Sequence, residues 1–422
     1  MYGKGFCSIL LIFIISVFLQ MKFTRLLLMV CLTGISFKMV AQNTSLLRGT
    51  VRDATTNAPI AYAAVSFSGS GLSTVTNSEG SFRFAVPAKH ATDSIVVASL
   101  GYKTYRVGLK RNLFATALLV AMVPQPFKLR EVAVVGHTPR SLLAQAIRAS
   151  TQLLLSPVMV SGYYREFTQT NGQYTKFADA LVDYYLKANP NNVRKPDIQV
   201  RVRESRAGEA PLTSKISLSR AIPSPMSVDR AMAWYNPIEG NNFLDSLNFD
   251  SYIYTIEAPS DPTSTMYYVI SFRPATHKSD RLNQGTVRID RQTLAILTID
   301  SSLPADMLPY SLELDIPGLH AKVAGRQIHR EFYQLHGQYY PGFARLHVDV
   351  DYTGAKGNFR LAFTSEILAT DAESPAVPFT RGEQYSGSLY KNGTYYQHPY
   401  WQDHSILPAT KAEEAVIAQL AE

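Results

Sequence analysis

The sequence predicts a mainly β protein, with an N-terminal β-sandwich followed by a larger α+β domain that has an antiparallel sheet and a few helices. Short β-rich runs recur about every ten residues up to residue 135, and from residue 139 a helix and longer alternating strands replace them. The length of 422 residues also exceeds one average domain. The composition, 46% hydrophobic and 18% charged, excludes disordered, collagen-like and coiled-coil chains.

Residues 1–42 are expected to form a signal-peptide region. They hold an apolar run at Ser8–Leu19 and a second one that begins at Leu26, each shorter than the roughly 20 residues of a membrane-spanning helix. Met21 is the expected start, because the lysine and arginine after it supply the positive segment that opens a signal peptide. No later segment reaches 18 apolar residues, so we expect an exported protein of the periplasm, outer membrane or cell surface with at most peripheral membrane contact.

Both cysteines of the chain, Cys7 and Cys31, lie inside this region. Cleavage after Gln42 would leave a protein without thiols, and two cysteines cannot build a disulfide scaffold or a Cys₄ zinc site. A competing interpretation makes Cys31 a lipidated residue, but Val30 stands where a lipoprotein signal has a small residue.

The formal charge of +8 suggests an anionic partner until the charges are located. Four basic residues and no acidic residue lie in residues 1–42, so residues 43–422 hold 37 basic against 33 acidic residues. That balance excludes nucleic acid as the partner.

Residues 43–137 are predicted to form the sandwich. Turn signals rich in Gly, Asn and Pro, such as Asn77–Gly80, separate its β-rich runs. The expected strands are Leu46–Arg52, Tyr62–Ser68, Leu72–Thr76, Ser81–Ala85, Ser94–Ser99, Tyr102–Val107, Thr116–Val123 and Arg130–Val135.

Three motifs of this domain, Arg48–Asp53, Thr76–Phe82 and Leu100–Tyr102, resemble in order and spacing the carboxypeptidase regulatory-like domain. This transthyretin-like, Ig-like domain is common in exported Bacteroidetes proteins. The resemblance implies a seven-stranded sandwich that serves as an accessory module, and it brings no catalytic residue with it.

Residues 138–422 are predicted to form the second domain. We expect a helix at about 139–155 and a final helix at about 410–421, which opens with a capping box at Thr410. The strands between them should form a long antiparallel meander with one polar face. They are Val160–Thr168, Tyr174–Leu186, Tyr252–Ala258, Tyr267–Arg273, Gly285–Asp290, Ala295–Ser301, Ser311–Ile316, Gly325–Leu335, Gln338–Asp351 and Asn358–Ile367.

The stretch from Lys187 to Leu247 shows a weaker pattern, with a short helix expected at Val228–Trp234. Its basic run Arg194–Arg206 is offset by acidic residues, which favours a solvated loop over a patch that binds an anionic ligand. Arg165-Glu166 lies in a Tyr-rich strand and is interpreted as part of a cross-strand ion pair on the rim of the sheet.

The first helix, the hairpin at Asn171–Gly172 and the strands from Tyr268 to Ile299 resemble in pattern the curved sheet of the LolA-like superfamily of periplasmic lipoprotein carriers. The resemblance implies a half-open curved sheet covered by helices. Its inner face would carry the apolar residues of one strand parity, including Tyr184, Phe272 and Leu346, and would either bind an apolar ligand or be plugged.

Motifs of common chemistry are absent from the sequence. We find no His-Glu-x-x-His, no P-loop, no G-x-G-x-x-G and no G-x-S-x-G. We therefore assign no catalytic residue, no cofactor and no metal site.

The best remaining metal candidates are His347, Asp349 and Asp351, which project from one face of a strand. Three polar residues opposite an apolar face more often form a solvated sheet surface, and we favour that interpretation. A cross-strand approach of His329 and Glu331 to His347 would give a catalytic pair, which we do not favour.

An aromatic cluster near the C-terminus could stack on sugars, but packing is the preferred interpretation. Its members are Tyr395, Tyr396, Tyr400 and Trp401.

The sequence therefore predicts a non-catalytic exported binding or scaffolding protein of the bacterial envelope, with an envelope protein or a glycan as partner. The alternative is a hydrolase or metal-dependent enzyme with an unrecognised site in the second domain. An outer-membrane transporter is excluded, because about 285 residues cannot hold a plug and a 22-stranded barrel.

Overall fold

The computed structural model describes residues 44–67, 73–99, 101–125, 138–154, 156–189, 196–210, 222, 227–232, 243–257, 267–277, 282–355, 357–392 and 407–420. Thr44–Glu422 forms one compact unit. The expected signal-peptide region, its cleavage site and both cysteines lie outside the described residues. Within the described stretches, no helix is long and apolar enough to span a membrane.

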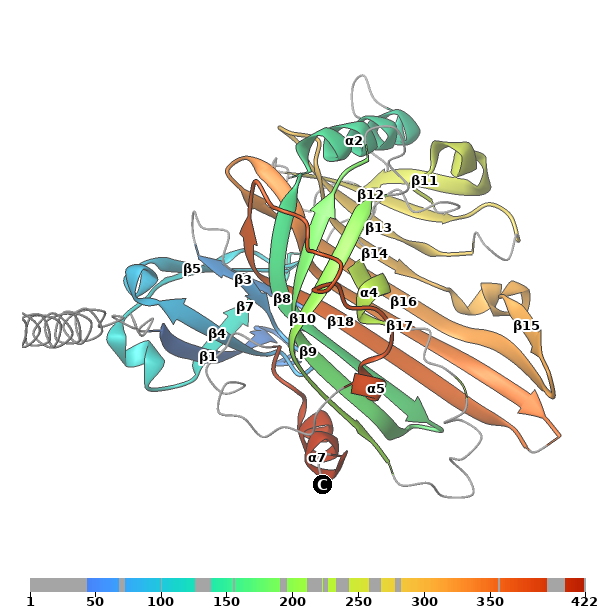
Figure 1. Ribbon diagram of the computed structural model, residues 1–422. Helices are drawn as coiled ribbons and strands as arrows, with labels where there is room; N and C mark the ends of the chain where they lie inside the picture. The colour runs from blue at the N-terminus through green and yellow to red at the C-terminus, as the bar shows by residue number, and fades with distance from the viewer. Residues whose placement is uncertain are drawn as a thin grey trace, which may run out of the picture. The chain divides into compact units, whose positions relative to one another are not determined.

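The first domain is a β-sandwich of two sheets, with the strand orders β4-β1-β7 and β3-β2-β5-β6 (Figure 1). Its core, which includes Leu47, Phe82 and Val120, draws only on residues of this domain. The domain thus has a hydrophobic core of its own, although its separability from the second domain stays a prediction. The last expected strand, Arg130–Val135, lies outside the described residues. The elements are β1 Thr44–Asp53, β2 Ala64–Phe67, β3 Ser73–Val75, β4 Ser81–Pro87, η1 Ala88–His90, β5 Ser94–Ala98, β6 Tyr105–Gly108, η2 Arg111–Phe114 and β7 Leu118–Met122.

The turn between β3 and β4 confirms the predicted role of Asn77–Gly80. Gly80 has a φ of +75°, and a Cβ there would lie 2.4 Å from the carbonyl oxygen of Val51. The side-chain oxygen of Asn77 accepts hydrogen bonds from the backbone N–H groups of Glu79 and Ser81. Its amide nitrogen donates to the carbonyl of Pro408 in the second domain.

The second domain is built on one curved antiparallel sheet of eleven strands. Its order is β10-β9-β8-β18-β17-β16-β14-β13-β12-β11, and β15 pairs with one end of β16. The predicted simple meander is wrong, because the last strand, β18, lies between β8 and β17 and joins two meanders. The strands are β8 Val158–Thr170, β9 Gln173–Lys187, β10 Asp197–Glu209, β11 Tyr252–Glu257, β12 Tyr267–Pro274, β13 Gln284–Asp290, β14 Ile296–Ser302, β15 Glu313–Ile316, β16 Leu319–Leu335, β17 Gln338–Gly354 and β18 Phe359–Glu373.

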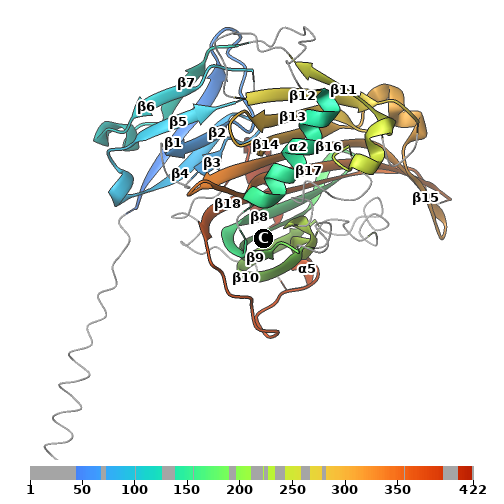
Figure 2. The same ribbon diagram turned by 90° about the horizontal axis from the view of Figure 1, so that it is seen from above.

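The two predicted terminal helices of this domain are confirmed. Thr138 caps the first helix, with its hydroxyl accepting from the N–H of Ser141, and the second opens with the expected capping box between Thr410 and Glu413. The first helix lies across β12 to β17 when the molecule is seen from above (Figure 2). The helices are α2 Pro139–Leu153, α4 Val228–Ala231, η4 Ser246–Ser251, η5 Ala305–Tyr310, α5 Leu389–Asn392 and α7 Lys411–Leu420.

The basic run interpreted as a solvated loop is a strand instead. From residue 197 it forms β10, which pairs with β9 along its whole length. Its isoleucine and valines alternate with arginines, and Arg201 and Arg206 bind Asp183 and Asp179 of β9. Those carboxylates are buried and therefore need the arginines as partners. The ion pairs stabilise residues 197–209 as a strand beside β9.

The register gives the sheet two chemically different faces. Phe272, Leu346 and Ala178 belong to one row of directly paired residues, and Tyr184 shares the parity of Ala178 on β9. We call this side the inner face, and α2, α4 and α5 pack on it. The opposite side, the outer face, contacts the sandwich and α7. The predicted shared face of Tyr184, Phe272 and Leu346 is confirmed.

The outer face carries a row of charged residues that lie directly opposite one another on seven neighbouring strands. Its closest contacts are 2.5 Å between Arg165 and Glu366 and between His329 and Asp300, and 2.7 Å between Arg206 and Asp179. Cross-strand pairs of opposite charge stabilise a sheet. Where such a pair is buried, removing one partner is strongly destabilising, because the other charge is left without compensation. This charge row consists of Arg206, Asp179, Arg165, Glu366, Arg345, His329 and Asp300.

Glu366 joins the two halves of the charge row, since it also lies 3.4 Å from Arg345. We predict that Glu366→Gln lowers the free energy of unfolding by about 3–5 kcal/mol, because it leaves the buried guanidinium of Arg165 without its main counter-charge. Chemical denaturation measures the change. The exposed carboxylate of Asp315 supplies the matched control Asp315→Asn, and equal losses in the two variants would contradict the role of the charge row.

Candidate functional site

The sandwich docks on the outer face of the sheet through Tyr62. The ring of Tyr62 stacks on Phe343 at a centroid distance of 5.7 Å and lies 6.1 Å from the ring of His329, while the guanidinium of Arg345 lies 5.4 Å from it. Tyr62 has a φ of +56°, a left-handed conformation that non-glycine residues rarely adopt. Such strain persists only where the surroundings fix the residue, so we interpret Tyr62 as the anchor of the first domain.

Arg165 extends this contact to the C-terminal segment. Its guanidinium lies 3.5 Å from Glu413 of α7 and donates weakly, at 3.4 Å, to the carbonyls of Leu407 and Pro408. Burial disfavours the charge, but Glu366 and Glu413 outweigh it and raise the pKa of Arg165 above its ordinary value. The predicted position on the rim of the sheet is wrong, because Arg165 lies on a central strand and only 2% of it is exposed.

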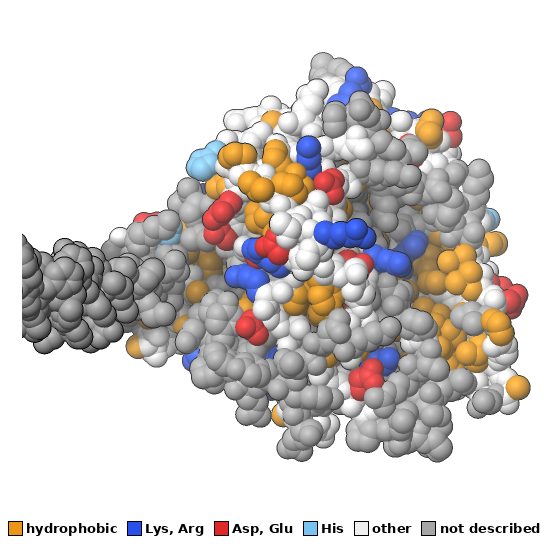
Figure 3. Space-filling view, viewed as in Figure 1, with side chains coloured by type: hydrophobic (Ala, Val, Ile, Leu, Met, Phe, Trp, Pro, Cys, Tyr) orange, Lys and Arg blue, Asp and Glu red, His pale blue; other side chains and the backbone are white. Residues whose placement is uncertain are grey.

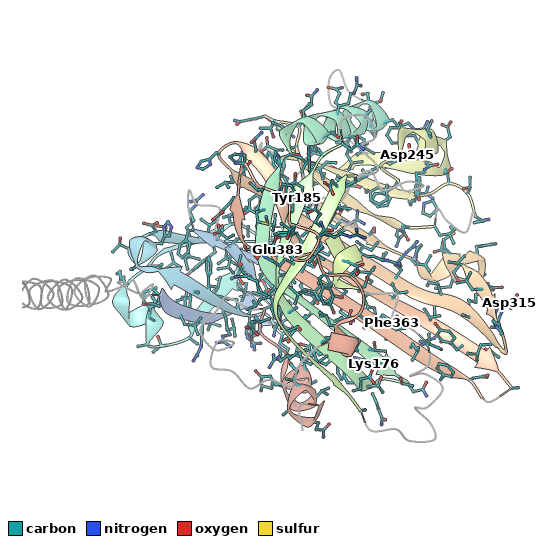
Figure 4. All side chains as sticks on the ribbon, in the orientation of Figure 1. Lys176, Tyr185, Asp245, Asp315, Phe363 and Glu383 are labelled. Carbon is teal, nitrogen blue, oxygen red and sulfur yellow. The ribbon has the colours of Figure 1, made fainter. Side chains whose placement is uncertain are left out.

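Glu166, the neighbour of Arg165, points to the inner face and makes no pair with it. The hydroxyl of Tyr164 donates a hydrogen bond to its carboxylate. Burial raises the pKa of Glu166 to about 7, and Tyr164, Tyr390 and Lys176 oppose this rise. Lys176 is labelled in Figure 4, where it lies near α5. Glu166 is thus a buried acid, and the predicted ion pair on the rim of the sheet is wrong for this residue as well.

His329 is the sixth of the seven residues of the charge row and lies next to Asp300, which ends it on β14. Its Nδ1 is 2.5 Å from Asp300 and its Nε2 is 3.2 Å from Glu331. Burial alone would lower the pKa of His329, but the hydrogen bonds to the two carboxylates raise it to about 10. His329 is therefore an imidazolium at neutral pH.

The three metal candidates share the outer face, where His347 and Asp349 contact each other and Asp351 pairs with Arg360 instead. The Nδ1 of His347 is 2.8 Å from the hydroxyl of Thr364, and its Nε2 is 3.3 Å from Asp349. Asp351 binds Arg360 through both carboxylate oxygens, at 2.6 and 2.7 Å. Within the described part of the chain, no three histidine, cysteine or acidic side chains are placed to hold a metal ion.

The structure does not bring the candidate catalytic pair together. On the paired strands β16 and β17, His329 lies opposite Arg345, and His347 lies opposite Gln327. Glu331 contacts His329 and lies opposite Phe343. The late aromatic residues from Tyr395 to Trp401 lie outside the described residues.

Two parts of the inner face are covered. The hydroxyl of Tyr184 donates to the carbonyl of Val228 at 2.8 Å, and α4 and α5 pack around it. At the other end, Phe272 stacks on Phe243 at 3.7 Å beneath the buried residues of α2. At these two places the face is plugged by its own chain.

The third part of the inner face, around Leu346, is only half-buried. The half-buried side chains of Leu346, Val348 and Val350 line up along β17. The register continues this apolar surface through Ala321 on β16 to Leu314 on β15. We call the half-buried and exposed members, Leu346, Val348, Val350, Leu314, Leu312 and Tyr310, the open apolar patch. Ala321 and Phe363 are buried members of the same cluster, against which Ile222 also packs.

Exposure is largest at the edge of the open apolar patch. Tyr310, Leu312 and Leu314 are 43%, 47% and 54% exposed. Figure 3 shows hydrophobic side chains grouped over η5 and β15, on the right of the view. A contiguous exposed apolar surface typically marks a binding site.

Comparisons with known proteins identify one part of the chain. Residues 47–134 match the family model of the CarboxypepD_reg-like domain. No curated protein matches the chain.

Solved structures show a remote likeness to part of this chain. A DUF1329 family protein from Desulfovibrio piger has 11% identity and a TM-score of 0.24, with 57% of this chain and 96% of that chain covered. A LolA superfamily protein from Nitrosomonas europaea has 10% identity and a TM-score of 0.21, with 57% and 98% covered. TM-scores of this size establish neither fold nor function. The motifs and the family model agree on the sandwich, so the first domain of this protein is a CarboxypepD_reg-like domain.

Proposed function

We propose that this chain is an exported envelope protein that acts by binding, and that the open apolar patch takes an apolar molecule or an apolar segment of an envelope partner. The observation that carries the proposal is the unequal cover of the inner face. Among the residues that the structure describes, α2, α4 and α5 cover the parts around Tyr184 and Phe272, whereas the part around Leu346 is half-buried and ends in Leu312 and Leu314, which are about half exposed. The apolar runs of residues 1–42 support export.

The contacts of the patch favour an apolar ligand over a polar one. Leu314 lies opposite Ala321, and Tyr352 on the next strand stacks on Phe359 at 5.1 Å. Apolar area removed from water stabilises a complex by roughly 25 cal/mol per Å², so a flat apolar surface binds what is itself apolar. The charged side chains of β15, Glu313 and Asp315, belong to the opposite parity.

The histidines of the outer face do not support the catalytic alternative. A general base must have a free lone pair near neutral pH, and His329 is protonated there. Both ring nitrogens of His347 have partners within the sheet. His329 and His347, the candidate catalytic histidines of the sequence, thus bind side chains of neighbouring strands.

Binding of an uncharged apolar dye, N-phenylnaphthylamine, tests the proposal. We expect saturable binding to residues 43–422 and about thirtyfold weaker binding by Leu312→Ser/Leu314→Ser, because each leucine contributes roughly 1 kcal/mol when partly buried. The matched control is Leu247→Ser/Val377→Ser, which removes two exposed apolar side chains outside the open apolar patch. Equal affinities in the two double variants, or no saturable binding by the unaltered protein, would refute the open apolar patch.

The protonation of His329 gives a pH dependence. The folded pKa of about 10 lies above the ordinary 6.5, so its stabilisation is complete below pH 6.5 and is lost as the pH rises through 10. At pH 6 the free energy of unfolding of the unaltered protein should exceed that of His329→Gln by about 1.5–3 kcal/mol, and this difference should be lost by pH 10. Denaturation at both pH values measures this, with the exposed His320→Gln of the same strand as control. A difference independent of pH would restore His329 as a candidate base.

A further inference from the structure

The strand β15 lies at an edge of the second domain's sheet. Among the residues that the structure describes, it pairs with β16 and has no strand on its other side. Figures 1 and 2 both show β15 at the margin of the second domain, and Figure 4 labels its Asp315 there. Such an edge carries backbone N–H and C=O groups that can pair with a strand of another chain.

The register shows which backbone groups face this free edge. The N–H of Val323 on β16 donates to the carbonyl of Leu312 at 2.9 Å. In an antiparallel ladder every second pair of residues exchanges such bonds, so the next bonded pair on β15 is at Leu314. Glu313 and Asp315, which alternate with these bonded residues, therefore turn their N–H and C=O groups away from β16.

The side chains of β15 offer two different surroundings to an added strand. Leu312 and Leu314 point to the inner face, belong to the open apolar patch and are about half exposed. Glu313 and Asp315 have the opposite parity, and the side chain of Asp315 is 93% exposed. An added strand would thus set alternate side chains beside leucines and beside carboxylates.

The two carboxylates of β15 are compensated only in part. Lys322 of β16 lies 2.6 Å from Glu313, and His320 lies 3.0 Å from Asp315 and 3.8 Å from Glu313. With the histidine neutral, these four side chains carry a net negative charge. A lysine or arginine opposite Asp315 would therefore add a cross-strand pair of opposite charge.

A second copy of this chain does not fit the edge. Both residues of β15 whose backbone faces it, Glu313 and Asp315, are acidic, so every antiparallel register of two such strands sets a carboxylate opposite a carboxylate. Like charges directly opposite on paired strands destabilise a sheet. The occupant that fits has basic residues opposite the carboxylates and apolar residues between them.

We propose that the free edge of β15 binds, as an additional strand, an extended segment of a partner protein in which basic and apolar residues alternate. Backbone hydrogen bonds supply the affinity of such a complex, and the alternate side chains supply its specificity. This inference rests on the proposed function, because the apolar residues of the segment cover part of the open apolar patch. It narrows the occupant of that patch to a peptide segment of stated charge.

Fluorescence anisotropy with labelled synthetic peptides tests the inference on residues 43–422, which include the whole compact unit. The probe is a seven-residue peptide in which lysine and valine alternate. It should bind saturably, and a peptide with the same residues in two blocks should bind about tenfold more weakly, because its side chains do not match the parity of β15. Methylation of the lysine backbone nitrogens should abolish binding, since it removes the donors that pair with the edge.

Charge reversal on the protein provides the second measurement. Asp315→Lys should weaken binding of the lysine–valine peptide about tenfold, because a cross-strand attraction becomes a repulsion. The same variant should bind a glutamate–valine peptide about tenfold more tightly than the unaltered protein does. The matched control is Asp250→Lys, which reverses another exposed acidic side chain that also has a basic partner.

Equal binding of the alternating and block peptides, or equal affinities in Asp315→Lys and Asp250→Lys, would overturn the inference. A dimer in sedimentation velocity that Asp315→Pro dissociates would assign the edge to a second copy, because proline removes the outward-facing N–H. N-phenylnaphthylamine separates these failures from that of the proposed function. Saturable dye binding without peptide binding refutes the added strand alone, whereas the loss of both refutes the open apolar patch as well.

Discussion

Arg165 holds a guanidinium inside the protein, in the middle of a row of charges that crosses seven strands. A buried charge is costly unless it is paired and hydrogen-bonded, so Arg165 requires its partners in place. Glu366 comes from β18 and Glu413 from α7, and the carbonyl of Pro408 binds Asn77 of the sandwich. One charge therefore ties the sheet, the C-terminal helix and the first domain into one unit.

This constraint decides which face of the sheet remains for function. The charged residues of the outer face satisfy one another, and the sandwich covers them through Tyr62. The histidines that resemble catalytic groups in the sequence belong to this closed network. The inner face is mostly apolar, with the buried Glu166 and Arg330 among its charged residues, and described helices of the chain cover two of its three parts. The half-buried part around Leu346 is the place where the proposed binding would occur.

Local patterns were sufficient to predict the elements of the fold. Alternation predicted nearly every strand, and the cap at Thr410 marked the last helix to within a residue. The shared face of Tyr184, Phe272 and Leu346 followed from parity, because the side-chain period of a strand is two. The motifs around Gly80 identified the first domain, since that turn requires a glycine.

Long-range pairing could not be predicted from the sequence. Arg165 and Glu366 are 201 residues apart, and nothing local shows that β18 returns to pair with β8. For the same reason β10 was taken for a loop, because its arginines are explained only by the buried carboxylates of β9. The anchor Tyr62 and the buried acid Glu166 carry no motif, and their character depends on the surroundings that the fold creates.

Amide hydrogen exchange with and without saturating N-phenylnaphthylamine tests the central proposal, that the protein binds an apolar ligand at the half-buried part of the inner face. The account predicts slower exchange in β15 and in the ends of β16 and β17 that pair beside it. Exchange in β9 and β10, beneath α4 and α5, and in the strands beneath α2 should stay unchanged. Slower exchange at those covered places, or no change in β15, would contradict the account.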